Sequence, residues 1–256
     1  MTRPLAPPPS LRPTLTDAER AQVQAVVGPA DDALLLPLRD ARGRAFERLE
    51  FLGDSVLDVV MAVHELVEPG CPACDGQGAA RLVTDARLGR RAVESGLGDW
   101  LEWQAGEDRL ADLVEGCAAV AFLAGAWPRA AAFTAAVVHP IGELSGQALR
   151  GAGVRTADPD ARPPETRRVG AALLELAAGR AVFAHDLAAD EGTLSTRRAA
   201  LHQVERVAAY ARRSHVVSAD GPDPVVSDRV ERLLADELLR RGADAALAHA
   251  TRVVLG

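Results

Sequence analysis

The sequence predicts an all-α protein, and the prediction rests on composition and apolar periodicity. Of the 256 residues, 48% are hydrophobic but only 4% are aromatic, a balance that favours packed helices over β-sheet. Apolar side chains recur three and four residues apart, as at Leu49, Leu52, Val56 and Val59, which is the spacing of one helix face. The first half contains no useful run of alternating apolar and polar residues, so we expect no strands there.

Capping residues and helix breakers set the expected helix boundaries. Thr16 and Asp17 can cap a first helix, which Gly28 and Pro29 would end. A loop is expected over residues 69–78, where two cysteines and three glycines gather. The helices expected in the first half span residues 17–27, 32–39, 45–66, 79–94, 110–126 and 130–138.

The chain is expected to divide into two units. Residues 1–13 are Pro-rich and predict a flexible tail. Residues 14–144 then form a first helical unit. Residues 145–164 combine Gly, Pro and polar residues, which is typical of a linker, and residues 165–256 form a second unit.

The second unit repeats the pattern of the first. Gly53 falls on Gly170 at an offset of 117 residues, and Glu115 falls on Glu231 at an offset of 116. Offsets this constant over a whole unit indicate an internal duplication.

Charge and cysteine content exclude some classes of protein. The net charge of −7 argues against non-specific nucleic-acid binding through a broad basic surface. There is no lysine, so every permanent side-chain cation is an arginine, which suits phosphate contacts, although a bias in base composition is the favoured explanation. Three cysteines are too few for a disulfide framework. Cys71 and Cys74 have the spacing of half a zinc site or a redox pair, but no second pair follows, so ordinary loop cysteines are favoured.

No apolar run of 18 residues and no signal peptide is apparent, which predicts a cytoplasmic protein that binds no membrane.

Five acidic residues stand out by their spacing. Glu47, Glu50 and Asp54 lie at i, i+3 and i+7, so one helix face carries three carboxylates. Asp112 and Glu115 form a second acidic pair on a later helix. Carboxylates lined up in this way repel one another, so a positive charge is expected near them.

A divalent metal ion can supply that charge. Two carboxylates 4 Å apart repel by about 4 kcal/mol at an effective dielectric constant near 20, and Mg²⁺, which prefers oxygen ligands, reverses the sign. Glu50, Asp54, Asp112 and Glu115 would form such a metal site if their two helices pack together. The alternative is an acidic helix face that binds no metal.

Residues 47–57, with the sequence ERLEFLGDSVL, resemble the signature motif of ribonuclease III, which reads close to ERLEFLGDAVL in that family. The family also has an Asp-x-x-Glu pair before small and apolar residues, as at Asp112 and Glu115. Residues 192–201 resemble the family's segment after its first long helix. The resemblance implies two tandem ribonuclease III-type helical domains that form an intramolecular pseudo-dimer, with a homodimer of chains as the alternative.

The resemblance implies an endoribonuclease that uses Mg²⁺ or Mn²⁺ to cut double-stranded or structured RNA, leaving 5′-phosphate and 3′-hydroxyl ends. The four carboxylates named above would bind the metal, and Glu47 would contact a metal-bound water or the RNA. Phe46 stands where the family commonly has Asn. In the family the signature helix lies at the pairing surface, where Gly53 and Gly170 would permit close approach.

The second unit lacks the first acidic cluster. The positions of Glu47, Glu50 and Asp54 are taken by Pro164, Arg167 and Ala171, so the second site is expected to be inactive. Asp228 and Glu231 remain there, and a solvated helix face is the expected role for them. One active site per chain would cut one strand per binding event.

Arginines of the second half are candidate contacts to the RNA backbone, with ordinary helix-surface charges as the alternative: Arg167, Arg168, Arg197, Arg198, Arg212 and Arg213. The chain ends without a separate double-stranded RNA-binding domain, which favours a defined structured substrate and a role in RNA processing. The alternative function is a non-catalytic RNA-binding or ribosome-associated scaffold that keeps the ribonuclease III fold.

Overall fold

The computed structural model describes residues 14–40, 43–69, 82–97, 107–151, 164–185 and 189–256. Over these residues the regular structure consists of eleven α-helices, one 3₁₀ helix and one π-helical segment, without a strand. The all-α prediction is therefore confirmed. The expected Pro-rich tail lies outside the described residues, as do Cys71 and Cys74.

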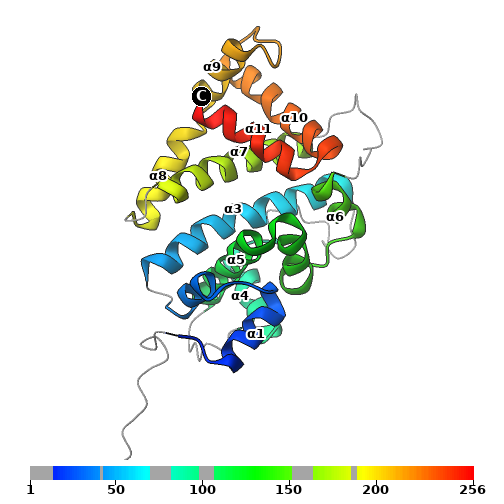
Figure 1. The fold of residues 1–256 in the computed structure, drawn as a ribbon. Coiled ribbons are helices and arrows are strands. Elements are labelled where there is room, and N and C mark those ends of the chain that lie inside the picture. Colours follow the sequence, from blue (N-terminus) through cyan, green and yellow to red (C-terminus); the bar gives the residue numbers. More distant parts are fainter. Residues whose placement is uncertain (1–13, 41–42, 70–81, 98–106, 152–163, 186–188) are drawn as a thin grey trace, which may run out of the picture.

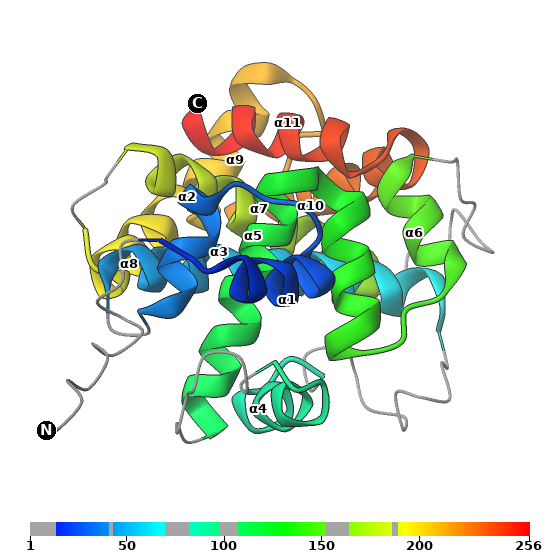
Figure 2. The same cartoon turned by 60° about the horizontal axis from the view of Figure 1, so that its bottom comes forward.

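The first half is built around two long helices, α3 and α5, which pack against each other. Figure 2 shows α4 beside α5, on the side away from α11. The elements of this half are α1 (Asp17–Val27), α2 (Asp32–Leu35), the 3₁₀ helix η2 (Leu36–Arg39), α3 (Arg44–Val67), α4 (Asp85–Glu94), α5 (Glu107–Phe133), the π-helical η6 (Thr134–Val138) and α6 (Glu143–Arg150).

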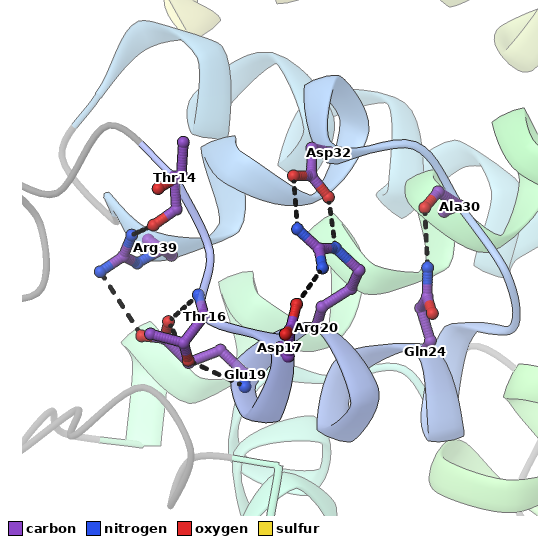
Figure 3. Close-up of polar contacts among 9 residues, drawn as sticks. All are labelled: Thr14, Thr16, Asp17, Glu19, Arg20, Gln24, Ala30, Asp32 and Arg39. Atoms are coloured by element: carbon purple, nitrogen blue, oxygen red, sulfur yellow. Dashed lines mark hydrogen bonds and ion pairs between the residues drawn. The ribbon is translucent and has the colours of Figure 1, made fainter.

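Helix α1 begins where its capping residues predict. Thr16 and Glu19 form a reciprocal capping box, with the Thr16 side chain accepting from the Glu19 backbone N–H. Figure 3 shows how Arg20 then ties α1 to α2: its guanidinium donates to both carboxylate oxygens of Asp32 at 2.8 Å and to Asp17 at 2.8 Å. This bidentate pair fixes the angle between the two short elements.

Two of the expected boundaries in this half are wrong. Helix α4 begins at Asp85 and not at residue 79, because Thr84 has extended backbone angles and occupies the N-cap position. Helix α5 begins at Glu107 and not at residue 110. Non-helical backbone angles at Gly125 and Ala126, with a positive φ of 53° at Ala126, divide α5 into two helical stretches at a kink, which agrees with the helix end expected at residue 126.

The linker expected over residues 145–164 is wrong at its start, because residues 143–150 form α6. The carboxylate of Glu68, at the end of α3, accepts from the backbone N–H of Ser145 at 3.0 Å and from its hydroxyl at 2.7 Å. The first turn of α6 is therefore capped by a side chain 77 residues away, which local sequence signals cannot reveal.

The second half has the same plan. Helices α10 and α11 pack on the long helix α7, and α9 packs on α10. Its elements are α7 (Pro164–His185), α8 (Glu191–Leu201), α9 (Val204–Ser214), α10 (Asp223–Arg241) and α11 (Ala243–Leu255). Figure 1 shows this half, coloured yellow to red, lying against the first half along α3 and α7.

A close helix crossing recurs in both halves. A Cβ atom built on Gly53 of α3 would lie 1.7 Å from the backbone oxygen of Glu115 in α5, and one built on Gly170 of α7 would lie 1.9 Å from that of Glu231 in α10. Both glycines therefore permit close packing within their own half. The expectation that they lie between the halves is wrong.

Helices α3 and α7 run antiparallel and join the halves. Near the start of α3, Arg48 donates to the backbone oxygen of Phe183 and lies over its ring, with 4.6 Å from guanidinium carbon to ring centroid. Near the other end of α3, Glu65 pairs with Arg168 of α7 at 2.7 Å. These contacts place the beginning of each helix beside the end of the other.

One stretch of the described chain, Arg109–Val138, is long and apolar enough to cross a membrane by length and composition. Two thirds of its most apolar 18-residue window, 67%, is buried inside the protein. Every 18-residue window of this stretch contains a charged residue, so the expectation of no uninterrupted apolar run of 18 residues is not contradicted. The burial is that of a helix at the centre of the first half.

We predict that Gly53→Ala and Gly170→Ala each lower the free energy of unfolding by about 2–3 kcal/mol, because the methyl group would overlap a backbone oxygen that cannot move without its helix. Urea unfolding measures the change. Gly192→Ala in α8 is the matched control, since its Cβ would meet no atom closer than 3.9 Å. This substitution should raise the free energy of unfolding by about 0.5–1 kcal/mol. Equal stability of all three variants would show that Gly53 and Gly170 are not needed for close packing of their helices.

Candidate metal centre

Three acidic side chains converge where α3 crosses α5. One carboxylate oxygen from each of Glu50, Asp112 and Glu115 lies within 4.8 Å of the other two. Glu50 is one turn before Gly53 on α3, and Glu115 carries the backbone oxygen that Gly53 faces. The close crossing therefore sets the distance between the two acidic motifs. We call Glu50, Asp112 and Glu115 the acidic triad.

Partial burial makes the triad costly to ionise. Burial, reinforced by Asp112, raises the pKa of Glu50 to about 8. Burial, followed by the charges of Asp54 and Glu50, raises the pKa of Glu115 to about 9. Arg109, half-exposed at the rim, lies 3.7 Å from Asp112 and opposes its negative charge.

The triad fits a hard divalent cation. Its donors are carboxylate oxygens from two helices, and Mg²⁺ and Mn²⁺ prefer oxygen ligands. A bound cation would remove the like-charge repulsion that raises both pKa values. The close crossing beneath the triad fixes α3, which carries Glu50, relative to α5, which carries Asp112 and Glu115.

Asp54, the fourth expected ligand, borders the triad but is not part of it. Its charge is the largest electrostatic contribution to the raised pKa of Glu115, which places it close by. Its Oδ2 atom lies 3.3 Å from Nη1 of Arg198, a residue of α8 in the second half. The structure therefore brings together three of the four predicted metal ligands and pairs the fourth with an arginine.

Glu47 lies one turn before Glu50 and also stays outside the triad. Its charge contributes to the raised pKa of Glu50, but less than burial and less than the charge of Asp112. Phe46, beside it, is fully buried, and its ring is 3.2 Å from where a Cβ on Gly116 would lie. Phe46 is thus a core residue beneath the acidic helix.

Sequence reasoning missed two acids of this region. Asp58 follows Asp54 by one turn, and burial, with the charges of Asp54 and Glu175, raises its pKa to about 7. Its i+4 spacing from Asp54 was a visible signal. Glu191, whose charge raises the pKa of Glu50, belongs to α8, and only the packing of α8 against α3 brings it near.

The matching position in the second half is closed by an arginine. Arg167, which takes the place of Glu50, lies with Nε 3.3 Å from Asp228 and 3.1 Å from Glu231. Glu231 is mostly buried, with its side chain 13% exposed, and burial raises its pKa. Asp228 and Glu231 are therefore partners of a guanidinium, and the solvated face expected for them is wrong.

At least four of the six arginines expected to contact RNA form ion pairs within the chain. Arg167 has the partners just described, Arg168 pairs with Glu65 and Arg198 with Asp54. Arg212 lies 2.7 Å from Asp223. Arg197 and Arg213 are exposed.

No protein-family model matches the sequence, and a search of curated proteins finds no match either. Function is therefore inferred from the residues of this chain and their geometry.

We predict that Glu115→Gln raises the melting temperature of the metal-free protein in EDTA, and more so at pH 8 than at pH 5. The raised pKa of Glu115, about 9, means that the unfolded chain releases this proton at lower pH than the folded one. The wild type therefore loses stability as pH rises from about 4.5 to about 9, and the glutamine variant does not. Glu94→Gln, on an exposed part of α4, is the control. A wild type more stable than Glu115→Gln at pH 8 would contradict the claim that burial and neighbouring acids disfavour the ionised form of Glu115.

Proposed function

We propose that this protein is a divalent-metal-dependent endoribonuclease of the ribonuclease III type with one active site per chain. The observation that carries the proposal is the helix crossing that brings Glu50 together with Asp112 and Glu115. These residues come from the two motifs that resemble the family's acidic motifs. Their convergence into one site with oxygen donors supports metal-dependent phosphodiester hydrolysis.

The proposed architecture is two tandem ribonuclease III-type units, residues 14–144 and 165–256, that form an intramolecular pseudo-dimer. The matching crossings at Gly53 and Gly170 support a duplication. The antiparallel contact of α3 with α7 is the arrangement that two-fold pairing of equivalent helices would give.

In the proposed reaction a bound Mg²⁺ or Mn²⁺ would polarise the scissile phosphate and lower the pKa of the attacking water. Glu50, Asp112 and Glu115 would hold the ion. Partial burial raises the pKa of Glu50 and of Glu115 and so disfavours their ionised forms until a cation binds. Arg109 at the rim, near Asp112, would face a phosphate oxygen of the substrate. Glu47, one turn before Glu50 on α3, would orient water or RNA beside the ion.

The proposed substrate is double-stranded or structured RNA, cut to 5′-phosphate and 3′-hydroxyl ends. With the second site closed by Arg167, one strand is cut per binding event. Arg197 and Arg213, which are exposed, would contact the RNA backbone.

A non-catalytic RNA-binding or ribosome-associated scaffold is the second candidate function. The arrangement around Arg167 favours it, because this half keeps its acidic pair neutralised by a side chain and needs no metal. The same fold is thus compatible with a purely structural role.

We predict that the purified protein nicks an end-labelled RNA duplex when Mg²⁺ or Mn²⁺ is present. Glu115→Gln should lower the rate by at least about 100-fold, the scale for loss of an electrostatic stabiliser. Denaturing gels reveal nicks, and native gels reveal cuts through both strands. Equal binding of the duplex by both proteins, with cutting by neither, would establish the scaffold instead.

We predict that the wild type binds Mn²⁺ at the acidic triad and not at Asp228 and Glu231, and that Arg167→Glu adds a second binding site. The substitution removes the guanidinium and restores a carboxylate at the position equivalent to Glu50. Titration calorimetry gives the number of ions bound per chain, and Arg213→Glu, at an exposed position of α9, controls for added negative charge. An unchanged stoichiometry in Arg167→Glu would show that the guanidinium is not what closes the second site.

A further inference from the structure

We propose that Arg198 is a positioning residue for Asp54, through which the second half completes the metal centre of the first. The inference rests on the proposed function, because it concerns how the same metal site is held. It assigns a role to the second half beyond pairing with the first: a side chain of α8 sets the orientation of a ligand on α3.

Arg198 is held by partners from both halves. Its Nη1 atom lies 3.3 Å from Oδ2 of Asp54 and donates to the hydroxyl of Ser55 at 2.8 Å. Its Nη2 atom lies 3.2 Å from Glu175 of α7. The guanidinium also lies over the ring of Phe51, 4.7 Å from its centroid. Because only 14% of its side chain is exposed, Arg198 has little freedom to adopt another rotamer.

This environment makes Arg198 a fixed anchor and Asp54 the group that it orients. Asp54 is 45% exposed and would otherwise sample several rotamers. The ion pair engages Oδ2, which leaves Oδ1 as the second oxygen available to a cation at the triad. Partners that hold a metal-binding carboxylate in this way typically contribute about 10- to 100-fold to metal affinity or activity.

A second ion pair between the halves provides a matched control. Arg168 of α7 and Glu65 of α3 are 2.7 Å apart, and their side chains are 33% and 25% exposed. Glu65 lies about three turns beyond Asp54 on α3 and about four turns beyond Glu50, the triad residue of that helix. Glu65→Gln therefore weakens the contact between the halves without touching the metal centre.

The test measures Mn²⁺ affinity by titration calorimetry, on full-length protein without RNA. We expect Arg198→Ala to raise the Kd of Mn²⁺ by about 10- to 100-fold, Arg198→Lys to recover part of the loss, and Glu65→Gln to leave the Kd unchanged. Asp54→Asn should weaken binding as Arg198→Ala does. The double variant should be no weaker than Asp54→Asn alone, because Arg198 acts only through that carboxylate.

Several results would overturn the inference and leave the metal site in place. They are an unchanged or lower Kd in Arg198→Ala, an equal loss in Glu65→Gln, or additive losses in the double variant. If Arg198→Ala does not fold by circular dichroism, Arg198→Gln takes its place and must show the same weakening. A wild type that binds no Mn²⁺, or binds it equally well with Glu115→Gln, would overturn the proposed function and this inference together.

Discussion

The contact between Gly53 and the backbone oxygen of Glu115 is the constraint on which the first half depends. Because no side chain separates them, α3 and α5 approach more closely than helices with larger residues at the crossing. The acids one turn before Gly53 and at Glu115 are then forced into one cluster. The spacing that permits tight packing is also the spacing that gathers the acidic triad, so stability and the proposed metal chemistry share one structural cause.

The two halves resolve the same electrostatic problem differently. In the first, Glu50 adds a third carboxylate to the pair from α5, and partial burial leaves the triad dependent on a cation or on protonation. In the second, Arg167 places a guanidinium against Asp228 and Glu231, where a buried charge without a partner would be costly. One change of side chain at equivalent positions thus separates the proposed metal site from one that is already neutralised by an arginine.

Most helices of the first half could be predicted because their signals are local. The capping box of Thr16 and Glu19 marks the start of α1, and the apolar stripe of Leu49, Leu52 and Val56 gives α3 to within one residue at each end. Helix α6 could not be predicted, because the carboxylate that caps it comes from Glu68 at the end of α3. A boundary set by a distant side chain leaves no mark on the neighbouring sequence.

The sequence by itself determined the acidic residues, their helical spacing and the loss of Glu50's equivalent in the second half, because these depend on residue type and on the helical repeat alone. Only the tertiary structure decided which acids meet. The crossing of α3 with α5 gathers Glu50, Asp112 and Glu115, whereas the packing of α8 against α3 draws Asp54 to Arg198. These outcomes depend on contacts between residues as much as 144 positions apart, and the geometry of packing, not local propensity, fixes such distances.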